Sequence, residues 1–449
     1  MFTQNYDYDV LYIGSGHGTF DGAIPLAAKG VKIAVVEAER IGGTCPNWGC
    51  NAKIILDNPV ALKRHMEDVH GIVNGSVTID WPANMAHKEE IIDGLPQAIE
   101  GMMTSNKIDV LFARAKLVDA HTVDVNGELK TADKIVISTG LRSNHLTIPG
   151  TEFAHDSRDF LALETMPKHI TIIGGGYIAL EFATMANEFG AQVNLLLHGD
   201  QALRAFPQAY VEQILADLAQ RGVNIKRNVE ITALEQSSDE VIVHTAADGE
   251  FTTDWVLDAT GRIPNVENIG LEAVGVDYNQ NGIVVDEYLR TSVPNIYASG
   301  DIIDKKIPKL TPTAVFESTY LMHTFAGDTT DPINYPVIPT VVFTSPRIAQ
   351  VGVSLDYALA NPDKYTVQKH DMKSDWFRQV GKPKFGEGAL IYNQAGQLVG
   401  ATELSEDAAE VINTLLPAIE FKFTAEQLER LVYLFPSIGF SAHALIKKP

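Results

Sequence analysis

Two cysteines are the residues of this chain best suited to redox chemistry. They are the only cysteines among 449 residues, and they lie five positions apart as Cys45 and Cys50 in the segment GGTCPNWGC. Across one helical turn and a bend, this spacing allows two sulfur atoms to reach bonding distance. A helix N-terminus beside them would favour the thiolate form. The segment therefore predicts a redox-active pair, with two inert buried thiols as the alternative.

A dinucleotide-binding pattern comes directly before the cysteines, in YDVLYIGSGHGTFDGAIPLAAKGVKIAVVEAE. Gly14 permits a tight turn after an apolar run, and Gly16 lets the backbone approach a pyrophosphate at the start of the following helix. Glu37 ends the second apolar run, where an acid can bond ribose hydroxyls. Thr19 stands at the third glycine of the fingerprint. Strand, turn, helix and acid together predict a dinucleotide site, with a purely structural glycine turn as the alternative.

The same pattern recurs about 160 residues later, which makes it an approximate internal repeat. The segment HITIIGGGYIALEFATMANEFGAQVNLLLHG places Gly174, Gly176 and Ala179 in the G-x-G-x-x-A spacing. The same physics then supplies a second dinucleotide site. Two sites imply two bound dinucleotides.

The end of the second repeat bears on which nicotinamide is used. Leu197 stands in the place of the ribose-binding acid, followed by His198 and, after one loop, by Arg204. These two side chains suit a 2′-phosphate better than a bare ribose, which favours NADPH over NADH. A solvated histidine and a surface arginine are the alternative reading.

Length and charge limit the remaining possibilities. A chain of this length exceeds one hydrophobic core and predicts two to four domains. Its formal net charge of −22 disfavours nucleic acid and anionic membranes as partners. No apolar run approaches the roughly 20 residues that span a bilayer, and the start MFTQNYDYDV has no basic n-region. We therefore expect neither a nucleic-acid nor a membrane partner, and a cytoplasmic location.

Later segments complete the expected organisation. Residues 132–140 and 254–265 each predict a buried strand ending in glycine that closes a dinucleotide unit. Residues 282–301 predict a further strand before Gly300 and Asp301, and residues 338–354 begin the pattern of a final domain.

Three charged residues outside the glycine turns also have candidate roles. The carboxylate of Asp301 could hold the hydroxyls of a ribityl chain, with a helix cap or turn former as the alternative. Lys53 and Glu181 could pair beside a bound flavin if the two dinucleotide units meet there. Each would otherwise be a surface residue.

At this point the sequence resembles the pyridine nucleotide-disulfide oxidoreductases, a family that includes glutathione reductase, dihydrolipoamide dehydrogenase and mercuric reductase. The motifs IGSGHGT, VVEA, GGTCPNWGC, ISTG, IIGGGYIALEFA, ATGRIPN, YASGD and LTPTAVFES follow the order and approximate spacing of that family. The resemblance implies an α/β fold of two Rossmann-like, doubly wound dinucleotide-binding domains with a C-terminal α+β dimerisation domain. It also implies FAD, NADP or NAD, and a homodimer. The expected domains are 1–148 (FAD, first part), 149–267 (NAD(P)), 268–332 (FAD, central part) and 333–449 (dimerisation).

The resemblance also assigns roles to single residues. Cys45 is similar to the interchange thiol that meets substrate, and Cys50 to the thiolate that contacts the flavin. Lys53 with Glu181 resembles the flavin-side ion pair, Tyr177 resembles the residue that covers the nicotinamide pocket, and no metal is expected. The implied cofactor-binding residues are Gly14, Ser15, Gly16, Glu37, Thr44, Ala115, Thr139, Gly140, Asp301, Gly174, Gly176, Tyr177, Ile178, His198, Arg204 and Gly261.

The C-terminal segment LVYLFPSIGFSAH departs from the family. Disulfide reductases carry a histidine and a glutamate here, which protonate a leaving thiolate, but this chain has Phe435 and Phe440 at those places. Loss of such a group lowers thiol exchange by about 10²- to 10⁴-fold. The nearest titratable substitutes are His443 and Tyr433. The Phe-Pro resembles mercuric reductases, but no cysteine follows Cys50, so Hg(II) reduction is not expected either.

These observations predict a homodimeric, FAD-dependent NAD(P)H oxidoreductase in which hydride passes from nicotinamide to flavin and on to the cysteine pair. The expected acceptor is a small disulfide. Reduction of a metal ion, a quinone or oxygen is the alternative activity. The alternative to an enzyme is an FAD-binding redox sensor whose active site has decayed.

Overall fold

The computed structural model describes residues 5–446, so the outermost residues of the two predicted terminal domains lie outside it. The chain forms two compact units, each assembled from three segments. Unit 1 comprises Met1–Lys53, Ala86–Asn144 and Arg262–Tyr335, and unit 2 comprises Ile54–Met85, His145–Gly261 and Pro336–Pro449. The finer division into four domains stays a prediction.

Unit 1 is built on a seven-stranded sheet with the order β3-β2-β1-β6-β5-β4, in which β19 also pairs with β6. The pairs joining β3, β2, β1, β6 and β19 are parallel. The apolar runs of β1, β2 and β19 are buried almost throughout, as expected for a parallel sheet covered on both faces, whereas β3 at the edge is partly exposed. The strands are β1 (Tyr8–Ile13), β2 (Ile33–Glu37), β3 (Asp109–Phe112), β4 (Ala115–Leu117), β5 (Thr122–Val125), β6 (Glu128–Ile137) and β19 (Ile296–Ala298).

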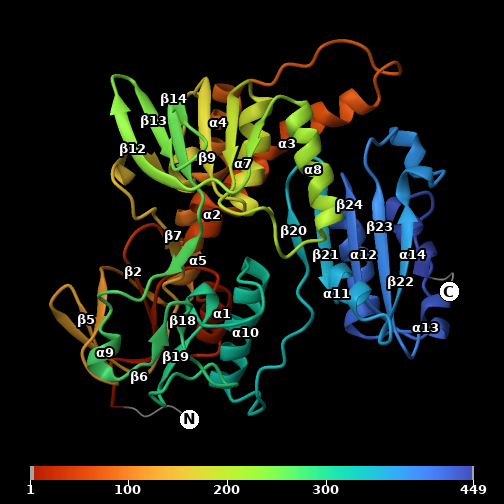
Figure 1. Cartoon of the computed structure of the whole chain (residues 1–449). Coiled ribbons are helices and arrows are strands. Elements are labelled where there is room, and N and C mark those ends of the chain that lie inside the picture. Colours follow the sequence, from red (N-terminus) through yellow and green to blue (C-terminus); the bar gives the residue numbers. More distant parts are fainter. Residues whose placement is uncertain (1–4, 447–449) are drawn as a thin grey trace. The chain divides into compact units, whose positions relative to one another are not determined.

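Two helices of unit 1 lie side by side, α1 (Phe20–Ala28) and α10 (Thr311–Ala326) (Figure 1). The backbone N–H of Gly22 donates to Ser318 Oγ at 2.8 Å. A Cβ atom at position 22 would lie 2.1 Å from the Ser318 carbonyl oxygen, so only glycine permits this approach. The other helices that enter unit 1 are α2 (Thr44–Trp48), α3 (Cys50–Asp68), α4 (Trp81–Ile92), α5 (Leu95–Ser105) and α9 (Leu271–Val274).

Unit 2 contains the second parallel sheet, with the order β11-β10-β9-β15-β8. A three-stranded antiparallel sheet, β12-β13-β14, accompanies it. The elements are β8 (Ala154–His155), α6 (Ser157–Phe160), β9 (His169–Ile173), α7 (Tyr177–Glu188), β10 (Gln192–Leu196), α8 (Gln208–Gln220), β11 (Asn224–Lys226), β12 (Ile231–Ser237), β13 (Glu240–Thr245), β14 (Glu250–Thr253) and β15 (Trp255–Asp258).

Unit 2 also contains a five-stranded antiparallel sheet with the order β20-β21-β24-β23-β22. Apolar residues of α12 and α14 form one buried cluster with residues of β21, β23 and β24. The elements are β20 (Thr340–Val342), β21 (Arg347–Gly352), α11 (Leu355–Ala360), β22 (Tyr365–Asp371), β23 (Glu387–Asn393), β24 (Leu398–Ser405), α12 (Ala408–Glu420), α13 (Ala425–Glu429) and α14 (Ile438–Ile446).

The predicted fold class is confirmed: two α/β sheets with parallel central strands are present, together with a C-terminal α+β region of antiparallel strands and helices. None of the helices within residues 5–446 has the length and apolar character needed to cross a bilayer.

Candidate active site

The two cysteines lie in unit 1, where the short helix α2 is followed by the start of the long helix α3. Cys45 is the second residue of α2, and Cys50 is the first residue of α3. Gly49 joins the two helices, and a Cβ atom there would lie 2.8 Å from the Thr44 carbonyl oxygen. This sharp join brings the two thiols within hydrogen-bonding contact. Both are free, Cys45 partly buried and Cys50 exposed.

The two thiols differ strongly in acidity. The Cys45 thiol donates a hydrogen bond to the Cys50 sulfur, and this bond lowers the pKa of Cys50 to about 6. The hydroxyl of Thr311, 3.5 Å from Cys50 Sγ, lowers this pKa further, as do the charges of Lys53 and His17. The same contact with Cys50, together with burial, raises the pKa of Cys45. At neutral pH the pair therefore carries one proton, on Cys45, and Cys50 is the thiolate.

The first glycine turn has the geometry of a pyrophosphate cradle. Gly14 has φ +102°, and a Cβ atom there would lie 2.5 Å from the Ser138 carbonyl oxygen. At Gly16 the nearest atom to such a Cβ is 3.8 Å away, so this side of the turn is open. The Glu37 carboxylate accepts from Ser15 N at 3.0 Å and from Ser15 Oγ at 2.6 Å. The acid predicted to bind ribose is thereby fixed beside the turn.

Asp301 lies in a short 3-10 helix directly after β19. Its Oδ1 atom is buried and has no hydrogen-bond partner within residues 5–446. Burial raises the pKa of this carboxyl, while Lys305, Arg262 and Lys309 oppose the change. A buried acceptor without a donor costs about 1 to 3 kcal/mol. The hydroxyls of a bound polyol, such as the ribityl chain of FAD, would satisfy it.

The remaining residues predicted to hold FAD all belong to unit 1. Thr139 and Gly140 follow β6 and are tied to Asn265: Thr139 Oγ1 donates to the Asn265 carbonyl at 2.9 Å, and Asn265 N donates to the Gly140 carbonyl at 3.0 Å. Ala115 is buried at the start of β4, and Thr44 is exposed at the start of α2.

The second glycine turn, in unit 2, repeats the features of the first. Gly174 has φ +137°, and a Cβ atom there would lie 2.3 Å from the Ala259 carbonyl oxygen. Gly176 has no atom within 4 Å of such a position, which leaves room for a phosphate at the start of α7. Tyr177 is exposed and Ile178 is partly buried, as the first two residues of that helix. Gly261 has φ +142° and likewise faces open space.

Two basic side chains lie beyond the end of β10. His198 and Arg204 are both exposed, and the preceding Leu197 is buried. A Cβ atom on Gly199 would lie 2.8 Å from Arg204 Nη2, so the guanidinium lies over the residue next to His198. The structure thus brings the two predicted phosphate-binding residues to one place on the surface of unit 2.

Lys53 and Glu181 belong to different units, and their pairing stays a prediction. Lys53, in the first turn of α3, is one of the charges that lower the pKa of Cys50. Glu181 is buried in α7, and its Oε1 atom accepts from the Phe343 backbone N–H at 2.9 Å.

The C-terminal segment forms an aromatic cluster in unit 2. The rings of Phe435 and Phe440 meet edge to face with centroids 5.0 Å apart, and Trp376 lies 6.2 Å from Phe435. His443 is buried, and its ring stacks on Tyr433 at 4.1 Å. The two phenylalanines therefore present exposed carbon at the positions where the resemblance implies an acid and a base.

Sequence reasoning missed two residues beside the cysteines, Thr311 and His17. Thr311 is the first residue of α10, within the family motif LTPTAVFES. His17 lies inside the first glycine turn, between Gly16 and Gly18. The one signal in the sequence that could have identified His17 is a titratable side chain within the predicted pyrophosphate-binding turn.

Known proteins match this chain over nearly its whole length. A family model described as pyridine nucleotide-disulphide oxidoreductase matches residues 8–318, and the model of its dimerisation domain matches residues 338–443. Glutathione reductase from Nostoc sp. is 31% identical over 452 residues, covering 97% of this chain and 98% of that protein. Dihydrolipoyl dehydrogenase from Bacillus subtilis is 32% identical over 447 residues, covering 96% and 94%. The structure of the HOCl-induced flavoprotein disulfide reductase RclA from Escherichia coli matches with a TM-score of 0.88 at 25% identity, covering 98% of this chain and 100% of that one.

Proposed function

Because this chain belongs to the pyridine nucleotide-disulphide oxidoreductase family, we propose that it uses NADPH and FAD to reduce a Cys45–Cys50 disulfide and passes the electrons to a small disulfide. The family identified from the motifs is confirmed, and its members are flavoprotein oxidoreductases that use NAD(P)H. The acceptor, the choice of NADPH and the residue roles are the parts proposed here.

One observation carries the proposal: the two thiols are adjacent but ionise differently. A thiolate is the reactive form of cysteine, and Cys50 holds it near neutral pH with support from Thr311 and Lys53. Cys45 keeps its proton until a base removes it. The pair is thus divided between a stable thiolate and a thiol that can be activated for attack on an acceptor.

The residues of unit 1 fit FAD, which supplies a two-electron carrier between nicotinamide and thiols when it is bound. Gly14 and Gly16 would hold its pyrophosphate, and Glu37 its adenosine ribose. Asp301 would accept hydrogen bonds from its ribityl chain through the buried Oδ1 atom.

NADPH is the proposed reductant because His198 and Arg204 gather beyond β10. A 2′-phosphate there would gain charge-assisted hydrogen bonds, about 1.5 to 3 kcal/mol each. Arg204→Leu is therefore expected to lower kcat/KM for NADPH by roughly 10-fold or more and to leave that for NADH unchanged. Equal losses with both nicotinamides would contradict this preference.

The match to a dimerisation domain supports a homodimer. Light scattering is expected to give twice the mass of one chain, and the mass of a single chain would contradict the proposal. The formal net charge of −22 supports neither nucleic acid nor an anionic membrane as partner, and the cytoplasmic location stays a prediction.

The central test is anaerobic titration of the purified protein with NADPH. We expect a long-wavelength absorbance from the Cys50 thiolate next to the flavin, present in Cys45→Ala and absent in Cys50→Ala. An absorbance that survives in Cys50→Ala would remove the pair as the redox relay. Turnover with a disulfide should be lost in both variants.

A second candidate activity is favoured by the exposed aromatic cluster of Trp376, Phe435 and Phe440. Quinones would pack on such rings, and neither a quinone, a metal ion nor oxygen requires a leaving thiolate to be protonated. Reduction of these acceptors should survive in Cys45→Ala, whereas disulfide reduction should not. Absence of NAD(P)H consumption with every acceptor would instead favour the redox sensor.

A further inference from the structure

The proton on Cys45 creates a chemical requirement that the C-terminal segment does not meet. Contact with Cys50 raises the pKa of Cys45, so the attacking thiol needs a base. The first thiolate displaced from a disulfide then needs a proton, because a poorly acidic thiol leaves slowly as its anion. Phe435 and Phe440 can serve neither purpose.

A histidine–aspartate pair lies in the first glycine turn of unit 1. His17 Nδ1 is 2.7 Å from Asp21 Oδ2, and the two side chains are only 22% and 25% exposed. Since a carboxylate can only accept, Nδ1 donates the hydrogen bond and Nε2 is left for proton transfer. The ring also rests against Phe20, with centroids 4.6 Å apart. An imidazole oriented by a carboxylate is the arrangement that activates nucleophiles in other enzymes.

The turn that carries His17 packs directly on the loop that leads to Cys45. The Gly42 N–H donates to Ser15 Oγ at 3.0 Å. A Cβ atom on Gly43 would lie 3.0 Å from Gly16 Cα, so the two loops touch one residue from His17 and two residues from Cys45. The charge of His17 also acts on Cys50 and lowers its pKa.

The charged and titratable groups around this site come from three helices. Asp21 belongs to α1, Cys45 to α2, and Cys50 with Lys53 to α3. Lys53 and His17 are the charges that act on the Cys50 thiolate. Among side chains, histidine is the one that most often serves as a general acid and base.

We propose that His17, oriented by Asp21, is the acid–base group of the oxidative half-reaction and replaces the absent C-terminal histidine and glutamate. This inference rests on the proposed disulfide reductase activity. His17 takes the proton of Cys45 as its sulfur attacks an acceptor RSSR, forming a Cys45–SR bond and breaking the S–S bond. The imidazolium gives that proton to the leaving RS⁻. The Cys50 thiolate then attacks Cys45, forms the Cys45–Cys50 disulfide and releases the second RS⁻, which takes a proton from solvent.

The test compares re-oxidation of the NADPH-reduced holoenzyme by two disulfides in a stopped-flow instrument. Hydroxyethyl disulfide has alkyl leaving groups that need a proton, whereas dithiobis-nitrobenzoate has aromatic thiolates that leave without one. His17→Gln is expected to slow the first reaction by about 10²-fold or more and the second by a clearly smaller factor. Asp21→Asn should also slow the reaction with hydroxyethyl disulfide more than the reaction with dithiobis-nitrobenzoate, but each effect should be smaller than in His17→Gln.

His323→Gln is the matched control. His323 also pairs with an aspartate, at 3.0 Å from Asp328, but it lies 12 residues after Thr311 in α10, about 18 Å along the helix. Both rates should be unchanged in this variant. Rates in His17→Gln that equal those of the wild type, or equal slowing with the two acceptors, would overturn the assignment.

A readout independent of the flavin is the alkylation of Cys45 by iodoacetamide in the reduced protein, followed by peptide mass spectrometry. Without its base, Cys45 should react more slowly between pH 6 and 8 in His17→Gln and Asp21→Asn than in the wild type. Unchanged alkylation in both variants would contradict the inference. If the wild-type protein reduces neither disulfide, the proposed function itself fails, which is a different outcome from variants that match an active wild type.

Discussion

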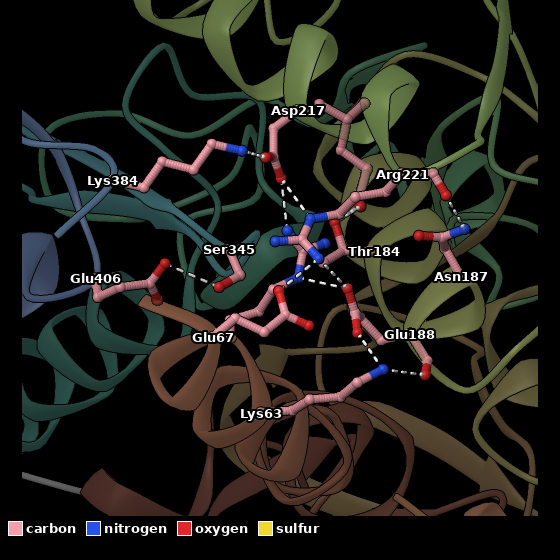
Figure 2. Close-up of polar contacts among 12 residues, drawn as sticks. Lys63, Glu67, Thr184, Asn187, Glu188, Asp217, Arg221, Ser345, Lys384 and Glu406 are labelled. Atoms are coloured by element: carbon pink, nitrogen blue, oxygen red, sulfur yellow. Dashed lines mark hydrogen bonds and ion pairs between the residues drawn. The ribbon is translucent and has the colours of Figure 1, made fainter. Parts of the chain in front are cut away.

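Arg64 of α3 and Asp217 of α8 form an ion pair at 2.5 Å in which the side chains are 4% and 1% exposed. Arg64 also contacts Glu188 of α7 at 2.5 Å. Figure 2 shows the surrounding partners: Arg221 and Lys384 meet Asp217, and Lys63 meets Glu188. Within unit 2, helix α3 is thus held by an ion-pair network centred on the buried side chains of Arg64, Glu188 and Asp217.

Removal of Arg64 should therefore be costly. Arg64→Met leaves two buried carboxylates with fewer partners, and we expect the free energy of unfolding to fall by about 3 kcal/mol. Urea unfolding followed by circular dichroism would measure it. Arg142→Met is the control, because Arg142 pairs with Glu267 at the surface and such pairs contribute at most about 1 kcal/mol. Equal effects of the two variants would contradict the buried network.

The Cys50 thiolate should titrate near pH 6. In the NADPH-reduced protein, the long-wavelength absorbance is expected to disappear as pH falls through about 6, because the pKa of Cys50 lies there. Thr311→Val removes a hydroxyl that stabilises the thiolate and should move this midpoint to higher pH. Thr324→Val changes the same residue type near the other end of α10 and should not move it. A midpoint unaffected by Thr311→Val would exclude that hydroxyl as a partner of the thiolate.

Asp301 should contribute to FAD affinity. Asp301→Ala removes the buried Oδ1 acceptor, and a hydrogen bond to a charged group contributes about 1.5 to 3 kcal/mol. Binding of FAD to the apoprotein is therefore expected to weaken by roughly 10- to 100-fold, measured by quenching of flavin fluorescence. Asp304→Ala, which loses a hydrogen bond from Asn279 at 2.8 Å, should bind normally. Unchanged affinity in Asp301→Ala would argue against the ribityl role.

Glu406 should make stability depend on pH. Burial raises its pKa to about 7, while a hydrogen bond from Ser345 Oγ at 2.9 Å (Figure 2) partly opposes this. The folded protein then holds a proton that the unfolded chain releases near its ordinary value of 4.5, so stability falls as pH rises from about 4.5 to 7.

Glu406→Gln removes that ionisation. The variant should gain up to about 3 kcal/mol over the wild type at pH 8 and little at pH 4.5, because one pKa unit corresponds to about 1.4 kcal/mol. Thermal unfolding at the two pH values measures the difference. An equal gain in stability at pH 4.5 and pH 8 would show that packing, and not the charge of Glu406, is responsible.

The sequence by itself determined the family, the fold class and the cysteine pair. These follow from local patterns: glycines at fixed offsets after apolar runs, and two cysteines five positions apart in GGTCPNWGC. Gly14 and Gly174 have positive φ, a conformation that glycine adopts without steric cost, and their place directly after an apolar run indicates the turn.

Only the tertiary structure decided which residues surround the thiols and how the proton is divided between them. Thr311 reaches Cys50 across 261 positions of the chain, and the loop of His17 meets that of Cys45 through Ser15 and Gly42. Arg64 finds Asp217 across 153 positions. Such contacts depend on how the strands and helices pack, and hydrogen bonding and burial then set each pKa, so no local pattern of residues could specify them.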